Sequence, residues 1–248
     1  MRSEPYGSRW TRQWARLGLG HTHPVRRDDD QLSKVQAARR QLAERGPHVV
    51  RYDGDFERVS LPAPEGDVLR DLVLADQAKT VIEIGLGYGA SALAIAEALV
   101  SQRSAGARHI ITDAYQDQFH GVGWHAIVAA GLTEICSLMP VRSQLALPQL
   151  VDEELVADVA FVDGSHIFHN VFVDLFFLRE LIRPGGLVIL DDCSWLSVAT
   201  ATRYFEINTG WQREPISQET RLRAYRLPDP RVEPNFEKFH PFGLNINS

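Results

Sequence analysis

Three aspartates stand where two apolar stretches of the sequence end. Asp163 follows one stretch, and Asp191 and Asp192 follow the other, 28 residues later, a gap that fits one helix and a turn. Neighbouring parallel strands bring their carboxyl ends to the same sheet edge, so the three carboxylates should converge. Unpaired they would repel one another, and bound Mg²⁺ or Mn²⁺ is the natural counter-charge. The alternative is that one aspartate caps the next helix and another is solvated.

His166 lies three residues after Asp163, where a helix is expected to begin. Imidazole suits a general base at neutral pH, and it could take a proton from a substrate hydroxyl that a cation has acidified. Two alternatives stay open. Asp163, His166 and His169 could together form a transition-metal site, or His166 could simply be an exposed or hydrogen-bonded histidine.

A glycine-rich turn offers a place for the ligand on which these groups would act. Residues 81–91 read Val-Ile-Glu-Ile-Gly-Leu-Gly-Tyr-Gly-Ala-Ser. The β-branched start predicts a buried strand over 80–84. Gly85, Gly87 and Gly89 allow positive φ and a close backbone approach, and the following helix points its free N–H groups at the turn. The stretch therefore predicts a site for a small, partly anionic ligand.

The spacing of the glycines bears on which ligand this is. A dinucleotide site has the pattern G-x-G-x-x-G with an acid about 20 residues further on. Here the pattern is G-x-G-x-G, and Glu83 stands two residues before the first glycine. This variant resembles motif I of the class I S-adenosylmethionine (SAM) methyltransferases, in which the turn holds the amino-acid end of SAM. A dinucleotide, or a tight turn without a ligand, remains the alternative.

Polar residues follow the next two expected strands. Asp113 ends the second strand, where an acid can accept hydrogen bonds from both ribose hydroxyls of SAM or of a dinucleotide, although it could instead cap a turn. Ser143 and Gln144 follow the third strand and could meet the edge of an adenine, or could be ordinary turn residues. Together they indicate a nucleoside ligand without choosing between the two.

The elements that must position these residues alternate regularly between strand and helix. Strands are expected at 80–84, 109–112, 136–140, 158–162 and 187–190, and helices at 91–101, 121–130, 144–153 and 167–181. This order predicts an α/β fold with a Rossmann-like, doubly wound and mostly parallel sheet and helices on both faces. A helix near 197–207 and a terminal antiparallel hairpin of 211–217 and 222–227 would complete it.

Length and composition restrict the class of protein. A chain of 248 residues, 44% of them hydrophobic, can bury one sizeable core. The net charge of −6 argues against nucleic acid as a partner, because a binder would need a basic face. Cys136 and Cys193 give neither a disulfide framework nor a zinc motif. No apolar run reaches the roughly 18 residues of a membrane span, and no signal core is visible, so we expect a cytoplasmic protein without a membrane partner.

The segment from about 60 to 195 resembles the cation-dependent O-methyltransferases of the catechol and caffeoyl-CoA types. The resemblance starts at Pro64-Glu65-Gly66, runs through the glycine turn, and includes the aspartates with their 28-residue gap. Two stretches are closer in sequence to a related bacterial branch of small-molecule methyltransferases. They are 161–166 (Phe-Val-Asp-Gly-Ser-His) and 184–192 (Pro-Gly-Gly-Leu-Val-Ile-Leu-Asp-Asp).

The resemblance implies a role for each residue of the site. The acid at Glu83 supports the glycine loop, Ser91 contacts the SAM carboxylate, and His166 takes the place of a catalytic lysine. The residues expected to bind SAM are Glu83, Gly85, Gly87, Tyr88, Ser91, Asp113, Ser143, Gln144 and Asp163. The residues expected to bind the metal are Asp163, Asp191 and Asp192. The catechol type has asparagine in place of Asp192, so this site is more anionic.

We expect the chain to have three parts, of which the first and the last lie outside the resemblance. Residues 1–55 would form an N-terminal helical extension with a helix over 31–45, and residues 56–228 a methyltransferase domain that begins with a helix over 65–75. Residues 229–248 would form a tail packed on the domain through Phe236, Phe239 and Phe242. Trp10 and Trp14 lie four residues apart, as on a short amphipathic helix, which makes a homodimer through this segment plausible.

The expected function is transfer of a methyl group from SAM to a hydroxyl of a small-molecule acceptor of natural-product, phenolic or sugar type. Mg²⁺ or Mn²⁺ would hold the hydroxyl, and His166 would remove its proton. Two alternatives remain: a metal-independent methyltransferase acting on an amine or carboxyl group, and a non-catalytic SAM- or nucleoside-binding protein. A dehydrogenase is more distant, because the glycine spacing departs from the dinucleotide pattern.

Overall fold

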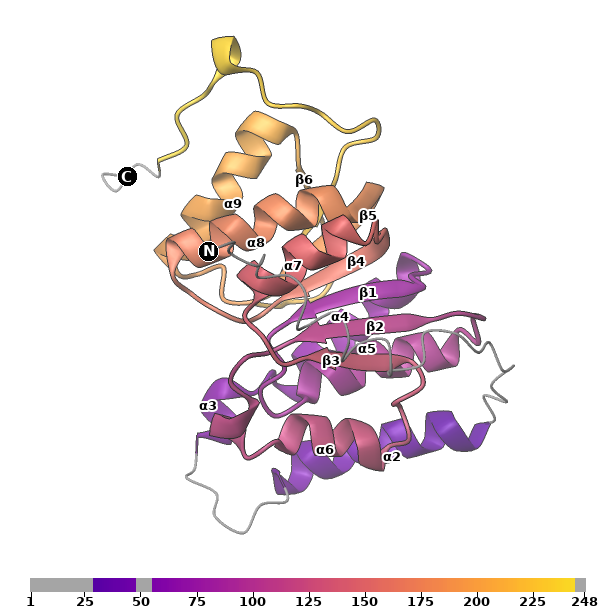
Figure 1. Cartoon of the computed structure of the whole chain (residues 1–248). Coiled ribbons are helices and arrows are strands. Elements are labelled where there is room, and N and C mark those ends of the chain that lie inside the picture. The colour runs from indigo at the N-terminus through magenta and orange to yellow at the C-terminus, as the bar shows by residue number, and fades with distance from the viewer. Residues whose placement is uncertain (1–28, 48–54, 244–248) are drawn as a thin grey trace, which may run out of the picture.

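The computed structural model describes residues 29–47 and 55–243. They contain a seven-stranded sheet of order β3-β2-β1-β4-β5-β7-β6 (Figure 1). The strands are β1 (Thr80–Ile84), β2 (Arg108–Thr112), β3 (Cys136–Met139), β4 (Ala157–Val162), β5 (Ile182–Leu190), β6 (Gln212–Glu214) and β7 (Arg223–Arg226). The first five are parallel, and β7 is antiparallel to both β5 and β6. The predicted Rossmann-like fold and terminal hairpin are thus confirmed.

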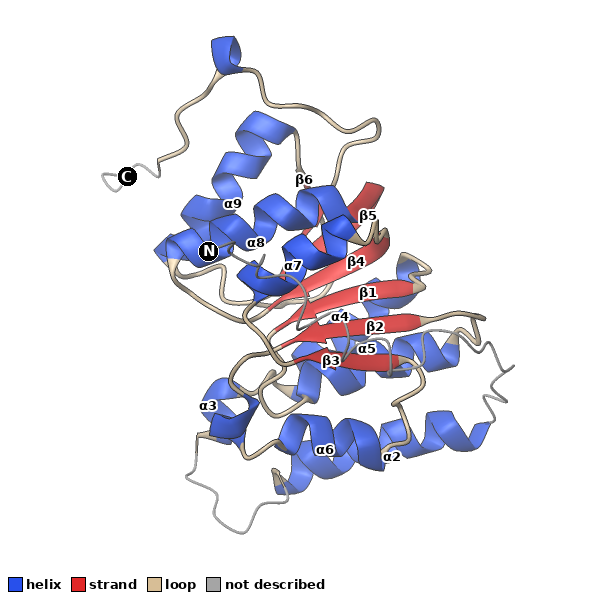
Figure 2. Ribbon diagram, in the orientation of Figure 1, coloured by secondary structure: helices blue, strands red, loops and turns tan. Residues whose placement is uncertain are grey.

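Helices cover both faces of the sheet (Figure 2). One face carries α2 (Asp29–Arg45), α4 (Ala63–Ala75), α5 (Ala90–Ser101) and α6 (Val122–Ala129), and the other carries α7 (Ser143–Asp152), α8 (Phe168–Leu181) and α9 (Leu196–Thr209). Short turns are α3 (Phe56–Val59), η1 (Gln116–Phe119) and η2 (Phe236–Lys238). None of the helices in the described residues is long and apolar enough to cross a membrane.

The strands divide their apolar residues between two cores because successive side chains point to opposite faces. In β4, Val159 and Phe161 join the core under α4 and α5, whereas Ala160 and Val162 join the core under α7, α8 and α9. All four are at most 4% exposed. The near-continuous apolar runs of the sequence therefore come from strands that are buried on both faces.

The start of β5 was predicted too late. The strand begins at Ile182, directly after α8, because Ile182 pairs with Ala157 ahead of a register shift in the ladder to β4. Pro184, Gly185 and Gly186 lie inside this irregular stretch, where Gly185 has φ +69°. Proline is tolerated in a strand at such a bulge.

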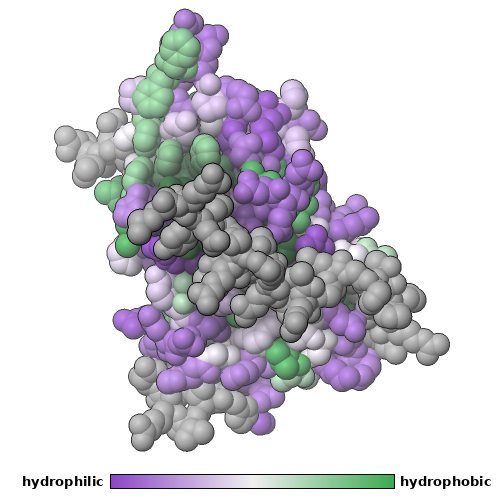
Figure 3. Space-filling view, viewed as in Figure 1, coloured by the Kyte–Doolittle hydropathy of each residue, from purple (hydrophilic) through white to green (hydrophobic). Residues whose placement is uncertain are grey.

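The C-terminal tail follows α8 and α9, and the space-filling view shows hydrophobic surface along it (Figure 3). Phe242 contacts Phe172 of α8 and Tyr204 of α9, and Phe239 contacts Phe242. The expectation that Phe236 also holds the tail is wrong, because its side chain is 90% exposed. The expected helix around Trp10 and Trp14 lies outside the described residues.

Backbone hydrogen bonds continue one residue beyond the ends of the parallel strands. The N–H donors and carbonyl acceptors are Asp191 to Val162, Asp163 to Ile84, Gly85 to Thr112, and Asp113 to Met139, at 2.9–3.2 Å. The residues that follow β1, β2, β4 and β5 are therefore fixed in one row at the carboxyl edge of the sheet. Three of the four are predicted site aspartates.

The closest approach in this row is between Gly85 and Asp163. A Cβ atom on Gly85 would lie 2.1 Å from the Asp163 carbonyl oxygen, and Gly85 has φ +93°. Glycine adopts this positive φ readily and has no Cβ to clash with the carbonyl. The loop after β1 can therefore lie directly against the end of β4.

We predict that Gly85→Ala destabilises the protein more than Gly106→Ala. Gly106 also has positive φ, +76°, but has nothing within 4 Å of its Cβ position. The control should cost about 1–2 kcal/mol for the left-handed conformation. Gly85→Ala should cost roughly 1–3 kcal/mol more because the backbone of Asp163 must move. Urea unfolding measures both, and equal losses would contradict the close approach.

Candidate active site

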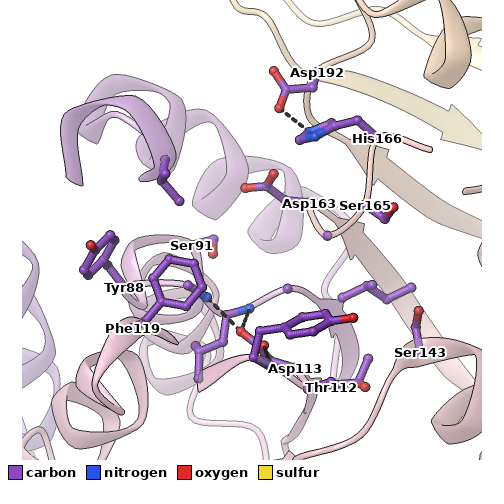
Figure 4. A pocket seen from close by; sticks show the side chains of 18 of the residues that line it. Tyr88, Ser91, Thr112, Asp113, Phe119, Ser143, Asp163, Ser165, His166 and Asp192 are labelled. Carbon is purple, nitrogen blue, oxygen red and sulfur yellow. Dashed lines mark hydrogen bonds and ion pairs between the residues drawn. The ribbon is translucent and has the colours of Figure 1, made fainter. Parts of the chain in front are cut away.

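A cavity of about 500 Å³ opens at the carboxyl edge of the sheet (Figure 4). Its wall takes residues from the loops after β1, β2, β3, β4 and β5, which are Gly85–Tyr88, Thr112–Tyr115, Val141–Gln144, Asp163–Ile167 and Asp192. In the close-up, His166 and Asp192 lie at one end, Asp113 and Ser143 at the other, and Asp163 between them. The volume is in the range of small-molecule sites.

Asp113 holds the glycine loop in place. Its Oδ2 accepts hydrogen bonds from the backbone N–H groups of Leu86 and Gly87, at 3.0 and 3.1 Å, and from Nε2 of Gln116 at 2.8 Å. Its Oδ1 accepts from the N–H of Tyr115 at 2.7 Å. The carboxylate therefore positions the loop and also borders the cavity, where the sequence predicted a ribose contact.

Glu83 lies behind the cavity wall and holds the cavity-lining residue Ser91 by a hydrogen bond. The glutamate is fully buried, its Oε1 accepts from Ser91 Oγ at 2.5 Å, and its Oε2 lies 2.8 Å from His109 Nε2. Ser91 itself borders the cavity. His109 was not among the predicted site residues, although a histidine inside an otherwise apolar strand is a visible signal.

The N-terminus of α5 is open toward the cavity. Gly89 precedes the helix with φ +88° and no side chain caps it, while Ala90 and Ser91 line the cavity wall. Gly87 has φ +49° and nothing within 4 Å of its Cβ position. Free N–H groups and the positive end of the helix dipole make such a terminus a binding place for an anionic group.

Tyr88 joins the glycine loop to the side of the cavity. It is 4% exposed, and its hydroxyl donates a short hydrogen bond to Asp55. Its ring makes edge contacts with Phe56 and Phe119, at centroid distances of 5.3 and 5.1 Å. The tyrosine thus fixes the walls at α3 and η1 against the loop.

Ser143 and Gln144 begin α7 at the far end of the cavity. Gln144 Nε2 donates to Ser143 Oγ at 2.9 Å and to Asp174 Oδ1 at 3.1 Å. Burial raises the pKa of Asp174 to about 6, and hydrogen bonds with Ser143 and Gln144 offset only part of this effect. The two predicted adenine residues are therefore held by a buried acid that the sequence analysis did not identify.

Asp163, His166 and Asp192 form a compact group at the other end. One candidate ligand atom from each lies within 4.8 Å of the others. His166 Nε2 is 2.7 Å from Asp192 Oδ2. Burial, and then the charges of Asp191 and Asp192, raise the pKa of Asp163 well above its usual value. Asp192 has φ +55°, a left-handed conformation that is uncommon outside glycine, although aspartate adopts it more often than most residues do.

Asp191 is paired with Arg221 and is not one of the three residues of this group. Its Oδ1 accepts from the backbone N–H of Asp192 at 2.7 Å, and its Oδ2 accepts from Arg221 Nη2 at 2.5 Å. Of the three predicted metal ligands, the structure brings Asp163 and Asp192 together with His166 and pairs Asp191 with Arg221. His169 is exposed on α8, outside the group.

Arg221 was not identified from the sequence, although it lines the cavity. It lies 30 positions after Asp191, in the turn of the terminal hairpin. The signal that could have found it is topological. Because β7 is antiparallel to β5, the residues just before β7 must lie beside the end of β5.

We predict that Asp174→Asn flattens the pH dependence of stability. The raised pKa means that the folded protein binds this proton more tightly than the unfolded chain does. The contribution of Asp174 is therefore fully present below about pH 4 and is lost as the pH rises through about 6. The variant should match wild type near pH 4 and exceed it by roughly 1–3 kcal/mol near pH 7.5.

Urea unfolding at both pH values measures this difference. The control is Asp152→Asn, at an exposed position of the neighbouring helix α7. A difference between Asp174→Asn and wild type that does not change with pH would show that the carboxyl is not held with a raised pKa.

Comparison with known proteins identifies the domain. Residues 82–193 match the family model described as a methyltransferase domain. A relative from Arabidopsis thaliana, named as a caffeoyl-CoA O-methyltransferase, is 30% identical over 154 residues, covering 62% of this chain and 63% of that protein's length. The catechol O-methyltransferase of Niastella koreensis is 28% identical over 166 residues, covering 66% of each chain. The chain thus spans less than two thirds of the length of these relatives.

Solved structures share the fold. An O-methyltransferase from Streptomyces achromogenes in complex with SAM matches with a TM-score of 0.55 and 20% identity, covering 81% of this chain and 90% of that one. An O-methyltransferase from Bacillus cereus in complex with SAH matches with a TM-score of 0.54 and 17% identity. The match covers 86% of this chain and 96% of that one. Residues 82–193 thus match a methyltransferase domain, and the resemblance of the chain to the catechol and caffeoyl-CoA O-methyltransferases is confirmed.

Proposed function

We propose that this protein is a SAM-dependent O-methyltransferase that methylates a hydroxyl group of a small molecule. The observation that carries the proposal is that one cavity is bordered both by the glycine loop with the open N-terminus of α5 and by the Asp163–His166–Asp192 group. The first half suits a donor with a carboxylate and a nucleoside. The second half suits deprotonation of an acceptor.

The residues along the cavity fit SAM from end to end. The N–H groups at the start of α5 and the Ser91 hydroxyl would bind the carboxylate of its methionine part. Asp113 lies where the ribose would follow, and Ser143 and Gln144 where the adenine would end. When bound, SAM supplies a methyl group on a positively charged sulfur. The protein's contribution is to hold that methyl in line with the acceptor oxygen.

His166 is placed to act as the general base. If Nε2–H donates to Asp192 Oδ2, across the observed 2.7 Å, the ring is oriented and Nδ1 is left to accept a proton. Asp192 then stabilises the imidazolium that forms, as the aspartate of a catalytic triad does. The acceptor hydroxyl would approach from the side of Asp163, between His166 and the donor.

The residues also fit a divalent cation. Asp163 and Asp192 offer hard carboxylate oxygens within 4.8 Å of each other, which suit Mg²⁺ or Mn²⁺. When bound there, a cation would lower the pKa of the acceptor hydroxyl. The two carboxylates would hold it, and the exposed side of the group leaves room for water and the acceptor. The acceptor itself is a small molecule of natural-product, phenolic or sugar type.

The test is a titration followed by an assay. We expect SAM to bind in isothermal titration calorimetry and S-adenosylhomocysteine to form when phenols, sugars and amines are screened as acceptors. EDTA should abolish turnover on a hydroxyl acceptor, and Mg²⁺ or Mn²⁺ should restore it. Full turnover in EDTA would remove the cation from the mechanism and favour an amine or carboxyl acceptor. SAM binding without any turnover would favour a binding protein, and no SAM binding would contradict the proposal.

We predict that His166→Ala lowers kcat by about 10²–10⁴-fold, because the acceptor proton loses its base. SAM affinity should be unchanged, since the histidine lies at the acceptor end of the cavity. His169→Ala is the control, because that histidine is exposed one turn away on α8 and should leave kcat unaffected. A loss of activity common to both variants, or a loss in neither, would contradict the role of His166.

A further inference from the structure

Arg221 comes from a different part of the chain and places a positive charge beside one of the three aspartates, Asp191. The arginine precedes β7, whose residue Arg223 pairs with Leu190 at the end of β5. This antiparallel register brings the residues just before β7 to the end of β5, where the Arg221 side chain reaches Asp191. The guanidinium lines the same cavity as Asp163, His166 and Asp192.

The ion pair joins a buried acid to a half-exposed base. Arg221 Nη2 lies 2.5 Å from Asp191 Oδ2; the aspartate side chain is 0% exposed and the arginine side chain is 41% exposed. A buried carboxylate needs a charge partner, whereas a guanidinium that is already near water can turn into it at little cost. Arg221 is therefore the partner that can leave.

The backbone around Arg221 is held independently of this ion pair. Glu65 of α4 accepts a hydrogen bond from the Arg221 backbone N–H at 3.2 Å and a short one from the Thr220 hydroxyl. The Thr220 oxygen in turn accepts from the N–H of Leu222 at 3.0 Å. The side chain can consequently change its position while the turn stays fixed.

We propose that Arg221 is a built-in counter-cation that competes with a divalent metal ion for Asp191, and so sets the metal affinity of the site. The inference rests on the cation of the proposed function. In the metal-free protein Arg221 neutralises Asp191, and the other two aspartates stay with His166. Metal binding turns the guanidinium toward water and frees Asp191 to join Asp163 and Asp192 around the ion. The site is therefore a weaker metal binder than three clustered aspartates would otherwise make.

The test is a titration of the full chain with Mn²⁺. Binding is measured by calorimetry and by the loss of the electron paramagnetic resonance signal of free Mn²⁺. Arg221→Met keeps an unbranched, flexible side chain and removes the guanidinium with its charge. We expect it to bind Mn²⁺ about 10–100-fold more tightly than wild type, a change of the same size as, but opposite in sign to, the loss of affinity seen when a supporting partner of a metal ligand is removed. Arg223→Met is the matched control, since it removes the same charge from a residue that interacts with Tyr225 and Cys193. It should change the affinity far less.

A double variant identifies the carboxylate. Arg221→Met with Asp191→Asn should lose the gain in affinity, because the ligand that Arg221 withholds is no longer present. Circular dichroism checks the fold of each variant, and Arg221→Gln replaces the methionine variant if that one does not fold.

The inference is overturned if Arg221→Met binds Mn²⁺ no more tightly than wild type, including the case in which neither binds it. A double variant as tight as the single one also overturns it. SAM titrations of the same samples report on the proposed function separately. Intact SAM binding with unchanged Mn²⁺ affinity would discard the competition by Arg221 and leave the methyltransferase in place.

Discussion

The site depends on a row of backbone hydrogen bonds that continues past the ends of four parallel strands. It fixes Asp113, Gly85, Asp163 and Asp191 next to one another at the sheet edge, in the spatial order of β2, β1, β4 and β5. The row can be this tight because Gly85 has no Cβ to meet the carbonyl of Asp163. Loops usually place functional groups with some freedom, whereas these residues are positioned by the sheet itself. The proposed donor and acceptor halves of the cavity thus share one rigid base.

Charge is distributed unevenly along this row. At the donor end, the carboxylates of Asp113 and Glu83 are engaged by the glycine loop and by Ser91, so they serve to hold the loop and the start of α5. At the acceptor end, the ion pairs of the described residues join Asp192 to His166 and Asp191 to Arg221. Excess negative charge at that end favours binding of a positive ion, as the proposed function requires.

The fold could be predicted from the sequence because its strands are short apolar runs bounded by glycine and polar residues. The parallel order then placed Asp163, Asp191 and Asp192 at one edge, and the structure brings the ends of their strands together as expected. Side-chain direction could not be predicted. Asp191 and Asp192 are neighbours, yet the positive φ of Asp192 and the pairing of Asp191 with Arg221 orient them differently. His109, Asp174 and Arg221 were missed because each acts through a contact distant in sequence, and single-sequence patterns carry little information about such contacts.

If the glycine loop and the acidic group are two ends of one SAM site, one ligand must contact both. A crystal structure of the protein grown with S-adenosylhomocysteine would show this. We expect the carboxylate of the ligand at Ser91 and the start of α5, its ribose at Asp113, its adenine at Ser143 and Gln144, and its sulfur facing Asp163 and His166. A ligand bound elsewhere, or bound with its adenine at the Asp163–His166–Asp192 group, would contradict it.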